Sequence, residues 1–310
     1  MKNPAKHSRS QRHSPMQIKP RVLFFGFSDV GYKCLKLLLE RGCDVVAVFT
    51  HDTDPHENQW FESAESLAKQ NNIPVYKPKS LKAKEWEDLA KELKPDLILS
   101  LYYRNFIPPS IFKLAKLGAY NMHGSYLPAY RGRAPLNWSI INGEDHCGVS
   151  LHVLEEGFDT GDIVDQEKVQ IAPDEYVGDV TPRITKAAVE VLGRSLDSLL
   201  SGNPKLKKQD LSKASYFGKR TPEMGRIDFT KSAREVFNLV RAVSHPFPGA
   251  FFDSDGKRIV VWRGHIAEKL DCKDKGKICG KILSKSPLKI ACSDAIFEVD
   301  DFDEEKIQES

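Results

Sequence analysis

A side-chain amide and an imidazole stand two residues apart in the chain, at Asn121 and His123. On an extended strand end, residues two apart point to the same side. An uncharged amide N–H can stabilise the oxyanion that forms when a carbonyl carbon becomes tetrahedral, and a neighbouring imidazole can move a proton near neutral pH. Ser125 is close by, but the G-x-S-x-G motif of a serine nucleophile is missing. This pattern predicts acyl transfer in which the substrate supplies the nucleophile.

The segment that contains this pair, residues 118–138, is expected to be an active-site loop. It starts as a short strand and continues into a turn rich in glycine and proline. Such residues are tolerated mainly where an irregular backbone must take a defined shape. Two guanidinium groups, Arg131 and Arg133, accompany the pair. Loops at strand ends are where α/β proteins place their chemistry.

A carboxylate behind the imidazole would orient the ring and raise its pKa. A second glycine-punctuated segment, residues 155–162, is called the acidic loop here and offers four acids. They are Glu155, Glu156, Asp159 and Asp162. The spacing of these residues does not select one of them.

The elements around these residues predict a doubly wound, mostly parallel α/β sheet. Near-continuous apolar runs predict buried strands at residues 21–27, 44–50, 96–101 and 118–122. Amphipathic runs predict helices at residues 32–40, 60–70, 83–93 and 108–117. The glycines after the first strand form neither the G-x-G-x-x-G fingerprint nor a P-loop, so they indicate a tight turn. Two strand ends carry polar or aromatic clusters, at residues 102–104 and 121–123, and ligands bind at such carboxyl edges.

The second half of the chain predicts two further strands, a helix and then a change of character. The strands are expected at residues 148–154 and 163–171, and the helix at residues 183–200. Short alternating segments after residue 223 predict a small C-terminal β-barrel-like domain with one helix, at residues 233–243. The expected organisation is a disordered leader (1–19), a catalytic domain (20–202), a linker (203–222), the barrel-like domain (223–300) and an acidic tail (301–310).

The net charge of +3 is located in the leader. Five of the 46 basic residues lie in residues 1–20 without any acid, so the rest of the chain holds 41 bases against 43 acids. A body that bound polyanionic nucleic acid would usually carry a basic excess. The composition therefore argues against a nucleic-acid partner.

Six scattered cysteines without a C-x-x-C pair are typical of a reduced cytoplasmic protein that has neither disulfides nor a zinc site. One polar cluster suggests a metal, but we interpret it as a solvated loop and expect no metal. Its members are His51, Asp52, Asp54 and His56. No apolar run approaches the ~20 residues that cross a bilayer, and the N-terminus lacks the apolar core of a signal peptide. We therefore expect a cytoplasmic location and no membrane span.

Residues 121–132, Asn-Met-His-Gly-Ser-Tyr-Leu-Pro-Ala-Tyr-Arg-Gly, resemble the signature of the folate-dependent formyltransferases. This family includes methionyl-tRNA formyltransferase, glycinamide-ribonucleotide formyltransferase and the sugar N-formyltransferases. The resemblance extends over residues 20–300 and implies the Rossmann-like formyltransferase fold, with 10-formyltetrahydrofolate as co-substrate. Position by position, it assigns the catalytic roles to Asn121, His123 and Asp159. Only this resemblance selects Asp159 from the acidic loop.

The resemblance also implies a set of folate contacts. Tyr102, Tyr103 and Arg133 are expected to contact the co-substrate, together with the backbone of the acidic loop. The loop residues concerned are Glu155, Glu156, Gly157, Phe158 and Asp159. For the two tyrosines, ordinary packing beneath the loop is the alternative interpretation.

Four stretches are similar to the formyltransferase half of the bifunctional polymyxin-resistance enzyme: residues 100–104, 131–138, 217–222 and 246–251. This likeness implies formylation of a nucleotide-linked amino sugar, UDP-4-amino-4-deoxy-L-arabinose, in lipid A modification. Formylation of methionyl-tRNA is the alternative, and only then would nucleic acid be a partner. The stretch Arg-Ala-Pro-Leu-Asn-Trp at 133–138 favours the sugar enzymes.

A non-catalytic folate- or nucleotide-binding protein is the third hypothesis. The sequence leaves open which amino sugar is modified and what the oligomeric state is. It also leaves open whether Met1 or Met16 is the native start, and whether a separate chain supplies a decarboxylase activity.

Overall fold

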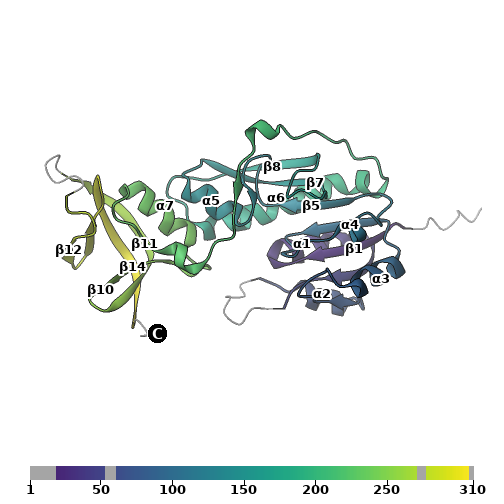
Figure 1. Cartoon of the computed structure of the whole chain (residues 1–310), viewed down its shortest axis with the longest axis horizontal. Coiled ribbons are helices and arrows are strands. Elements are labelled where there is room, and N and C mark those ends of the chain that lie inside the picture. The colour runs from purple at the N-terminus through teal and green to yellow at the C-terminus, as the bar shows by residue number, and fades with distance from the viewer. Residues whose placement is uncertain (1–18, 53–60, 271–276, 307–310) are drawn as a thin grey trace, which may run out of the picture.

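The structure is a computed structural model that describes residues 19–52, 61–270 and 277–306. Residues 1–18 of the predicted leader, Asp54, His56 and residues 307–310 of the predicted tail lie outside these ranges. The described chain forms a larger amino-terminal domain and a smaller carboxy-terminal domain placed end to end, which makes the molecule elongated (Figure 1).

A seven-stranded sheet forms the centre of the larger domain, in the order β3-β2-β1-β4-β5-β7-β8. Neighbours from β3 to β5 run parallel, whereas β7 and β8 are added antiparallel. The strands are β1 (Arg21–Gly26), β2 (Asp44–Phe49), β3 (Val75–Tyr76), β4 (Leu97–Leu101), β5 (Ala119–His123), β7 (His146–Val153) and β8 (Ile163–Gln170). This arrangement confirms the predicted α/β class with a mostly parallel sheet.

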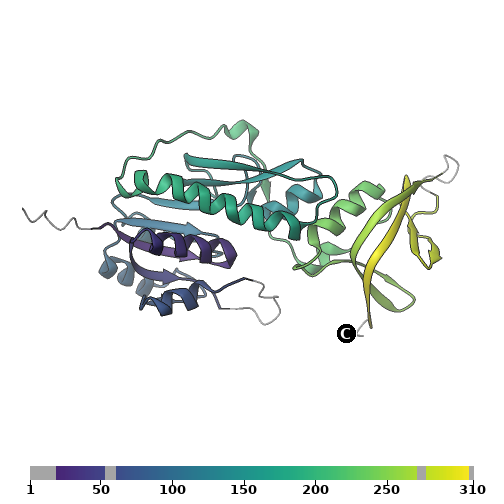
Figure 2. The same ribbon diagram turned by 180° about the vertical axis from the view of Figure 1, so that it is seen from behind.

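Helices cover both faces of this sheet because its strands are apolar on both sides. On β1, Val22 and Phe24 belong to one buried cluster, and Leu23 and Phe25 belong to the other. The first cluster is covered by α1 (Ser28–Glu40), α2 (Ala64–Gln70) and α6 (Val177–Leu200), and the second by α3 (Lys84–Leu93) and α4 (Pro109–Phe112). Figure 2 shows α1 and α6 side by side across one face.

The helix predicted over residues 183–200 begins six residues earlier, at Val177. Asp179 Oδ2 accepts a hydrogen bond of 2.9 Å from Tyr176 N, which caps the first turn. Pro182 lies inside the helix, where a missing N–H would normally indicate a boundary. The cap and the buried apolar side of α6 therefore outweigh the local proline signal.

The smaller domain contains α7 (Ala233–Val243) and a five-stranded antiparallel sheet. Its strands, in spatial order, are β10 (Ala250–Ser254), β11 (Lys257–Lys269), β14 (Ala295–Lys306), β13 (Leu288–Ala291) and β12 (Ile282–Lys285). The predicted boundary at residue 300 is wrong, because β14 continues to Lys306 and pairs with β11. The acidic side chains hide this strand from periodicity analysis, since both of its faces are exposed there.

The linker returns to the larger domain before it reaches the smaller one. It leaves α6 and passes over the edge of the sheet at β8, as the green segment in Figure 1 shows, with backbone hydrogen bonds between Lys207 and Ile163. Its strand β9 (Tyr216–Phe217) pairs with β6 (Arg131–Gly132) of the active-site loop. That loop ends in α5 (Pro135–Ile141), which packs against α7 and was not predicted.

Candidate active site

Asn121 and His123 lie at the carboxyl end of β5, as the spacing predicted. Their neighbours Tyr120 and Met122 point into the main apolar cluster, so the amide and the imidazole share the other side of the strand. Strand β5 pairs with β4 on one side and with β7 on the other. The backbone of the pair is thus fixed by hydrogen bonds to two neighbouring strands.

A second imidazole, His152 of β7, lies beside this pair, and no role was predicted for it from the sequence. It lies directly opposite Asn121 in the β5–β7 register. Its Nδ1 lies 2.8 Å from the carbonyl oxygen of Val153, which can only accept, so Nδ1 carries the proton. The unprotonated Nε2 then accepts a hydrogen bond of 3.1 Å from Asn121 Nδ2. His152 therefore fixes which end of the Asn121 amide is the donor.

The acidic loop places Asp159 between the two imidazoles. Asp159 Oδ1 lies 3.6 Å from His123 Nδ1 and 3.5 Å from His152 Nε2. Asp159 Oδ2 accepts a hydrogen bond of 2.9 Å from Gly132 N. Among the four acids of the acidic loop, the one selected by family resemblance is thus the one that reaches the pair.

The orientation of His123 is set mainly by Tyr130 rather than by the carboxylate. His123 Nε2 donates to the carbonyl oxygen of Tyr130 at 2.8 Å, which leaves Nδ1 of the neutral ring toward Asp159. The 3.6 Å separation from Asp159 is an ion-pair distance and too long for a hydrogen bond. Asp159 therefore acts on His123 through its charge.

The pKa values of the two groups are shifted in ways that suit proton transfer. Burial lowers the pKa of His123, and the Asp159 carboxylate opposes that effect in part. Burial alone would raise the pKa of Asp159, but His123, His152 and the Gly132 N–H together hold it well below its usual range. At neutral pH the site therefore holds an ionised carboxylate beside a neutral imidazole that can take up a proton.

The nearby hydroxyl and thiol are not arranged as nucleophiles. Ser125 is only 1% exposed, and its Oγ donates to the carbonyl oxygen of Ala129 at 2.6 Å. Cys147 is buried too, and this burial raises the pKa of its thiol, so the reactive thiolate is disfavoured. The hydrogen bond of Ser125 and the burial of Cys147 are both consistent with the expectation that the substrate supplies the nucleophile.

Comparison with known proteins places the chain in a family. Residues 20–196 match the formyl transferase family, and residues 219–309 match its C-terminal domain. The chain belongs to the formyl transferase family.

Several solved structures share the fold of this formyl transferase. One is HypX from Aquifex aeolicus in complex with tetrahydrofolic acid, at 22% identity and a TM-score of 0.63. The match covers 93% of this chain but 45% of HypX, so the chain spans a little under half of that protein.

Two further structures match over nearly their whole length. The sugar 3N-formyl transferase WlaRD, solved in the presence of dTDP and 5-N-formyl-THF, has 19% identity and a TM-score of 0.68, covering 94% of this chain and 100% of that one. An N-formyltransferase from Helicobacter canadensis, in complex with folinic acid and dTDP-3-aminofucose, has 20% identity and a TM-score of 0.68, covering 91% and 99%.

The predicted folate contacts of the formyl transferase lie along one rim of the site, except for the two tyrosines, whose rings pack inward. Arg133 Nη2 donates to the carbonyl oxygen of Arg104 at 2.9 Å, next to Tyr103. Phe158, which is 64% exposed, contacts the ring of Phe106 beyond β4. The segment after β4 therefore meets both the active-site loop and the acidic loop. Glu155, Glu156 and Gly157 are exposed beside Phe158.

Both tyrosines pack inward. Tyr103 lies against the second apolar cluster with its hydroxyl buried, and its ring stacks on that of His51 with 4.4 Å between the centroids. Tyr102 packs toward the other face of the sheet. Its ring lies against the main apolar cluster, and its hydroxyl approaches Gly124 so closely that a Cβ there would be 2.4 Å away. Only glycine fits this contact. Folate contact by either tyrosine stays a prediction, and packing is the role that both positions support.

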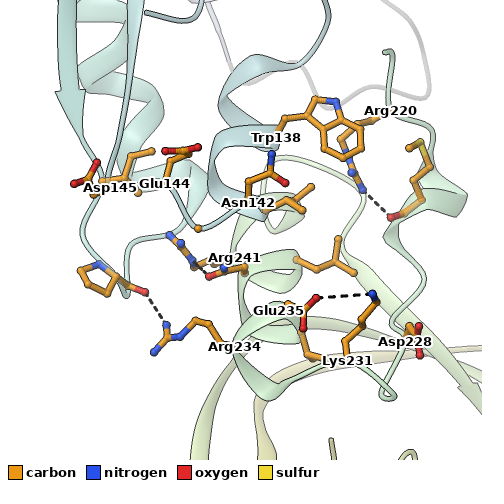
Figure 3. Close-up of a pocket in the computed structure, with 18 of the residues that line it drawn as sticks. Trp138, Asn142, Glu144, Asp145, Arg220, Asp228, Lys231, Arg234, Glu235 and Arg241 are labelled. Carbon is orange, nitrogen blue, oxygen red and sulfur yellow. Dashed lines mark hydrogen bonds and ion pairs between the residues drawn. The ribbon is translucent and has the colours of Figure 1, made fainter. Parts of the chain in front are cut away.

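A cavity of about 1100 Å³ lies where the two domains meet (Figure 3). Its walls come from α5 and the turn after it, from the end of the linker and from α7. The three predicted catalytic residues, all of them described, do not line it. Tyr130 connects the two places, because its carbonyl holds His123 while its hydroxyl bonds Glu144 at 2.7 Å and Asn142 at 3.1 Å in the cavity wall.

The cavity wall is rich in arginine and carries one large aromatic ring. The guanidinium of Arg220 lies 4.7 Å from the ring centroid of Trp138. Arg220, Arg234 and Arg241 donate to the carbonyl oxygens of Met224, Pro173 and Glu175, respectively. Within the described part of the chain, none of the three forms an ion pair with a carboxylate. Sequence stretches containing Trp138 and Arg220 supported the resemblance, but no role was predicted for them.

Two polar clusters elsewhere are occupied by contacts within the protein. His51 Nε2 accepts from Arg104 N at 3.0 Å, and Asp52 pairs with Lys77 at 2.7 Å. Among described residues, His265, Glu298 and Asp300 have ligand atoms within 4.8 Å of one another, with His265 3.0 Å from Asp300.

No helix in the described ranges has both the length and the apolar character needed to span a membrane.

Proposed function

We propose that the protein transfers a formyl group from 10-formyltetrahydrofolate to the amine of a nucleotide-linked amino sugar. The observation that supports this most is the Asn121, His123, His152 and Asp159 cluster, which contains an oxyanion donor and a proton acceptor but no protein nucleophile. Such a site suits direct attack by an acceptor amine.

The proposed reaction uses each member of the cluster once. Bound 10-formyltetrahydrofolate supplies the formyl carbon on its N10. The acceptor amine forms a C–N bond to this carbon, and the developing oxyanion receives the second N–H of Asn121, the first being donated to His152. His123 Nδ1 takes the proton that the amine loses, beside the Asp159 carboxylate, and returns it to N10 as the C–N10 bond breaks. No proton is left over.

The folate is expected to lie along the rim formed by Arg133 and the acidic loop. Two similar structures contain tetrahydrofolic acid or 5-N-formyl-THF, which supports a folate at the corresponding place. The exposed ring of Phe158 suits a ring system, while Arg133 suits a carboxylate.

The cavity at the domain boundary is the proposed nucleotide-sugar site. Guanidinium groups without carboxylate partners in the cavity wall favour a diphosphate. Structures of similar fold contain dTDP or dTDP-3-aminofucose, which supports this class of acceptor. UDP-4-amino-4-deoxy-L-arabinose is the acceptor that the likeness of residues 131–138 and 217–222 favours.

A parallel assay tests this proposal. The purified protein is incubated with 10-formyltetrahydrofolate and, separately, with UDP-linked amino sugars, dTDP-linked amino sugars and methionyl-tRNA, and the products are identified by mass. We expect formylation of at least one nucleotide sugar, with UDP-4-amino-4-deoxy-L-arabinose turned over fastest. Turnover of methionyl-tRNA alone would contradict the acceptor class.

A further inference from the structure

One side chain of the linker turns inward among exposed neighbours. Residues 205–208 and Asp210 are exposed, whereas Gln209 between them is half-buried. Two backbone hydrogen bonds of 2.8 Å between Lys207 and Ile163 fix this part of the linker at the first residue of β8. Since β8 follows the acidic loop directly, Gln209 lies next to that loop.

Gln209 makes three hydrogen bonds, and they connect the two loops of the site. Its Nε2 donates to the carbonyl oxygens of Asp159 at 2.9 Å and Gly161 at 2.7 Å. Its Oε1 accepts from Arg131 Nη2 at 2.9 Å. Carbonyl oxygens only accept and a guanidinium only donates, so one amide orientation satisfies all three contacts.

Asp159 requires such support because its own segment restrains it poorly. Residues 155–158 are exposed, and Asp159 has a φ of 54°, which a residue with a Cβ rarely adopts. Such a conformation persists where the surroundings determine it. Gly132 N fixes the Asp159 carboxylate, whereas Gln209 fixes its backbone.

Arg131 depends on the same contact. Its side chain is buried, its Nε has no hydrogen-bond partner in the described structure, and its Nη2 donates to Gln209. A buried guanidinium with few partners is costly to maintain. Gln209 therefore stabilises both ends of the contact between the active-site loop and the acidic loop.

We propose that Gln209 is a positioning residue for formyl transfer, which holds the Asp159 carboxylate between His123 and His152. The expected effect of Gln209 on turnover rests on the proposed function. Its effect on the position of Asp159 rests on the contacts alone. Neither the resemblance nor the family match assigns a role to this residue.

The test compares Gln209→Met, which keeps the length of the side chain and removes all three hydrogen bonds, with Lys208→Met at the exposed neighbouring position. We expect kcat for formyl transfer to fall roughly 10- to 100-fold in Gln209→Met, because displacement by about 1 Å costs rates of this order. The KM for the nucleotide sugar should change less than twofold. Lys208→Met should behave as wild type.

A second readout needs no substrate. The pKa of His123, measured by NMR titration, should fall in Gln209→Met because the Asp159 carboxylate that raises it is no longer held nearby. If the wild type formylates none of the acceptors, the proposed function fails, while this titration still decides the role of Gln209.

Gln209→Glu provides a second variant should Gln209→Met not fold. Its carboxylate can still accept from Arg131, but it would repel the carbonyl oxygens of Asp159 and Gly161. We therefore expect kcat to fall at least as far as in Gln209→Met. Wild-type kcat per folded molecule and an unchanged His123 pKa in a folded Gln209 variant would overturn the proposal.

Discussion

The two parts of the site are positioned by different means. Asn121 and His123 lie on β5, whose backbone pairs with β4 and β7 and whose other side is buried in the apolar core. Asp159 lies on an exposed loop with a left-handed backbone, and hydrogen bonds from Gly132 and Gln209 hold it in place. The strand thus fixes one half through its regular ladder, and single contacts from distant segments fix the other.

This difference has a consequence for mutation. Changes on the strand side should remove a chemical group without moving its neighbours, because the ladder is independent of the side chain. Changes around Asp159 should move the carboxylate itself. Asn121→Ala tests the first kind of effect, and Gln209→Met tests the second.

Asn121→Ala should have the largest effect, since it removes the oxyanion donor. Loss of one such donor lowers kcat by about 10²- to 10³-fold. Tyr120→Phe on the same strand is the matched control, because its hydroxyl points to the other side and bonds Leu117 O. Steady-state kinetics with circular dichroism check the result. An Asn121→Ala protein that is folded and within tenfold of wild-type kcat would refute the oxyanion role.

Asp159→Asn should have the next largest effect and lower kcat by roughly 10- to 100-fold. The amide keeps the size of the side chain and an acceptor for Gly132 N, but the negative charge is lost. Because that charge raises the pKa of His123, its removal lowers this pKa. The acidic limb of the pH–kcat profile should therefore move to lower pH. A profile that stays in place would show that Asp159 does not act on His123 by charge.

Arg220→Met should affect binding rather than chemistry. We expect the KM for the nucleotide sugar to rise about tenfold, which is the order of one charge-assisted hydrogen bond. The KM for 10-formyltetrahydrofolate and kcat should stay near wild type. Lys219→Met, at an exposed position outside the cavity wall, is the control. Equal losses in both variants would place the nucleotide elsewhere.

His51→Gln should have the smallest effect, on stability in acid. Burial, followed by the charges of Arg104 and Arg133, lowers the pKa of His51 to about 4. With an unfolded pKa of about 6.5, the unfolded chain binds a proton that the folded chain does not as pH falls from ~6.5 to ~4. The wild type should lose stability across this window, and His51→Gln should lose less. Thermal midpoints from pH 7 to 4 measure this, and parallel curves would contradict it.

Much of the fold followed from local patterns. The apolar runs at β1, β2, β4 and β5 identified the parallel core, and α7 was predicted at its observed bounds. The same alternation placed Asn121 and His123 on one side of β5. The end of β14 was missed because its acidic side chains are exposed on both faces, so burial leaves no pattern there.

The rest of the site depends on contacts between distant segments. Asp159 was selected by resemblance alone, since loop spacing gives no direction to a side chain. His152 could have been found by pairing the predicted strand 148–154 with β5, but its register is set by the turns between them. Gln209 and Tyr130 act through contacts with residues 50 and 7 positions away, and no local pattern marks these contacts. The catalytic roles of Asn121, His123 and Asp159 remain predictions.

The most direct test of the account is the rate of formyl transfer by His123→Ala. The purified variant is compared with wild type under saturating 10-formyltetrahydrofolate and nucleotide sugar, with the thermal midpoint measured alongside. We predict a fall in kcat of at least about 100-fold in a protein that is folded like wild type. A folded His123→Ala protein with near-wild-type kcat would contradict it.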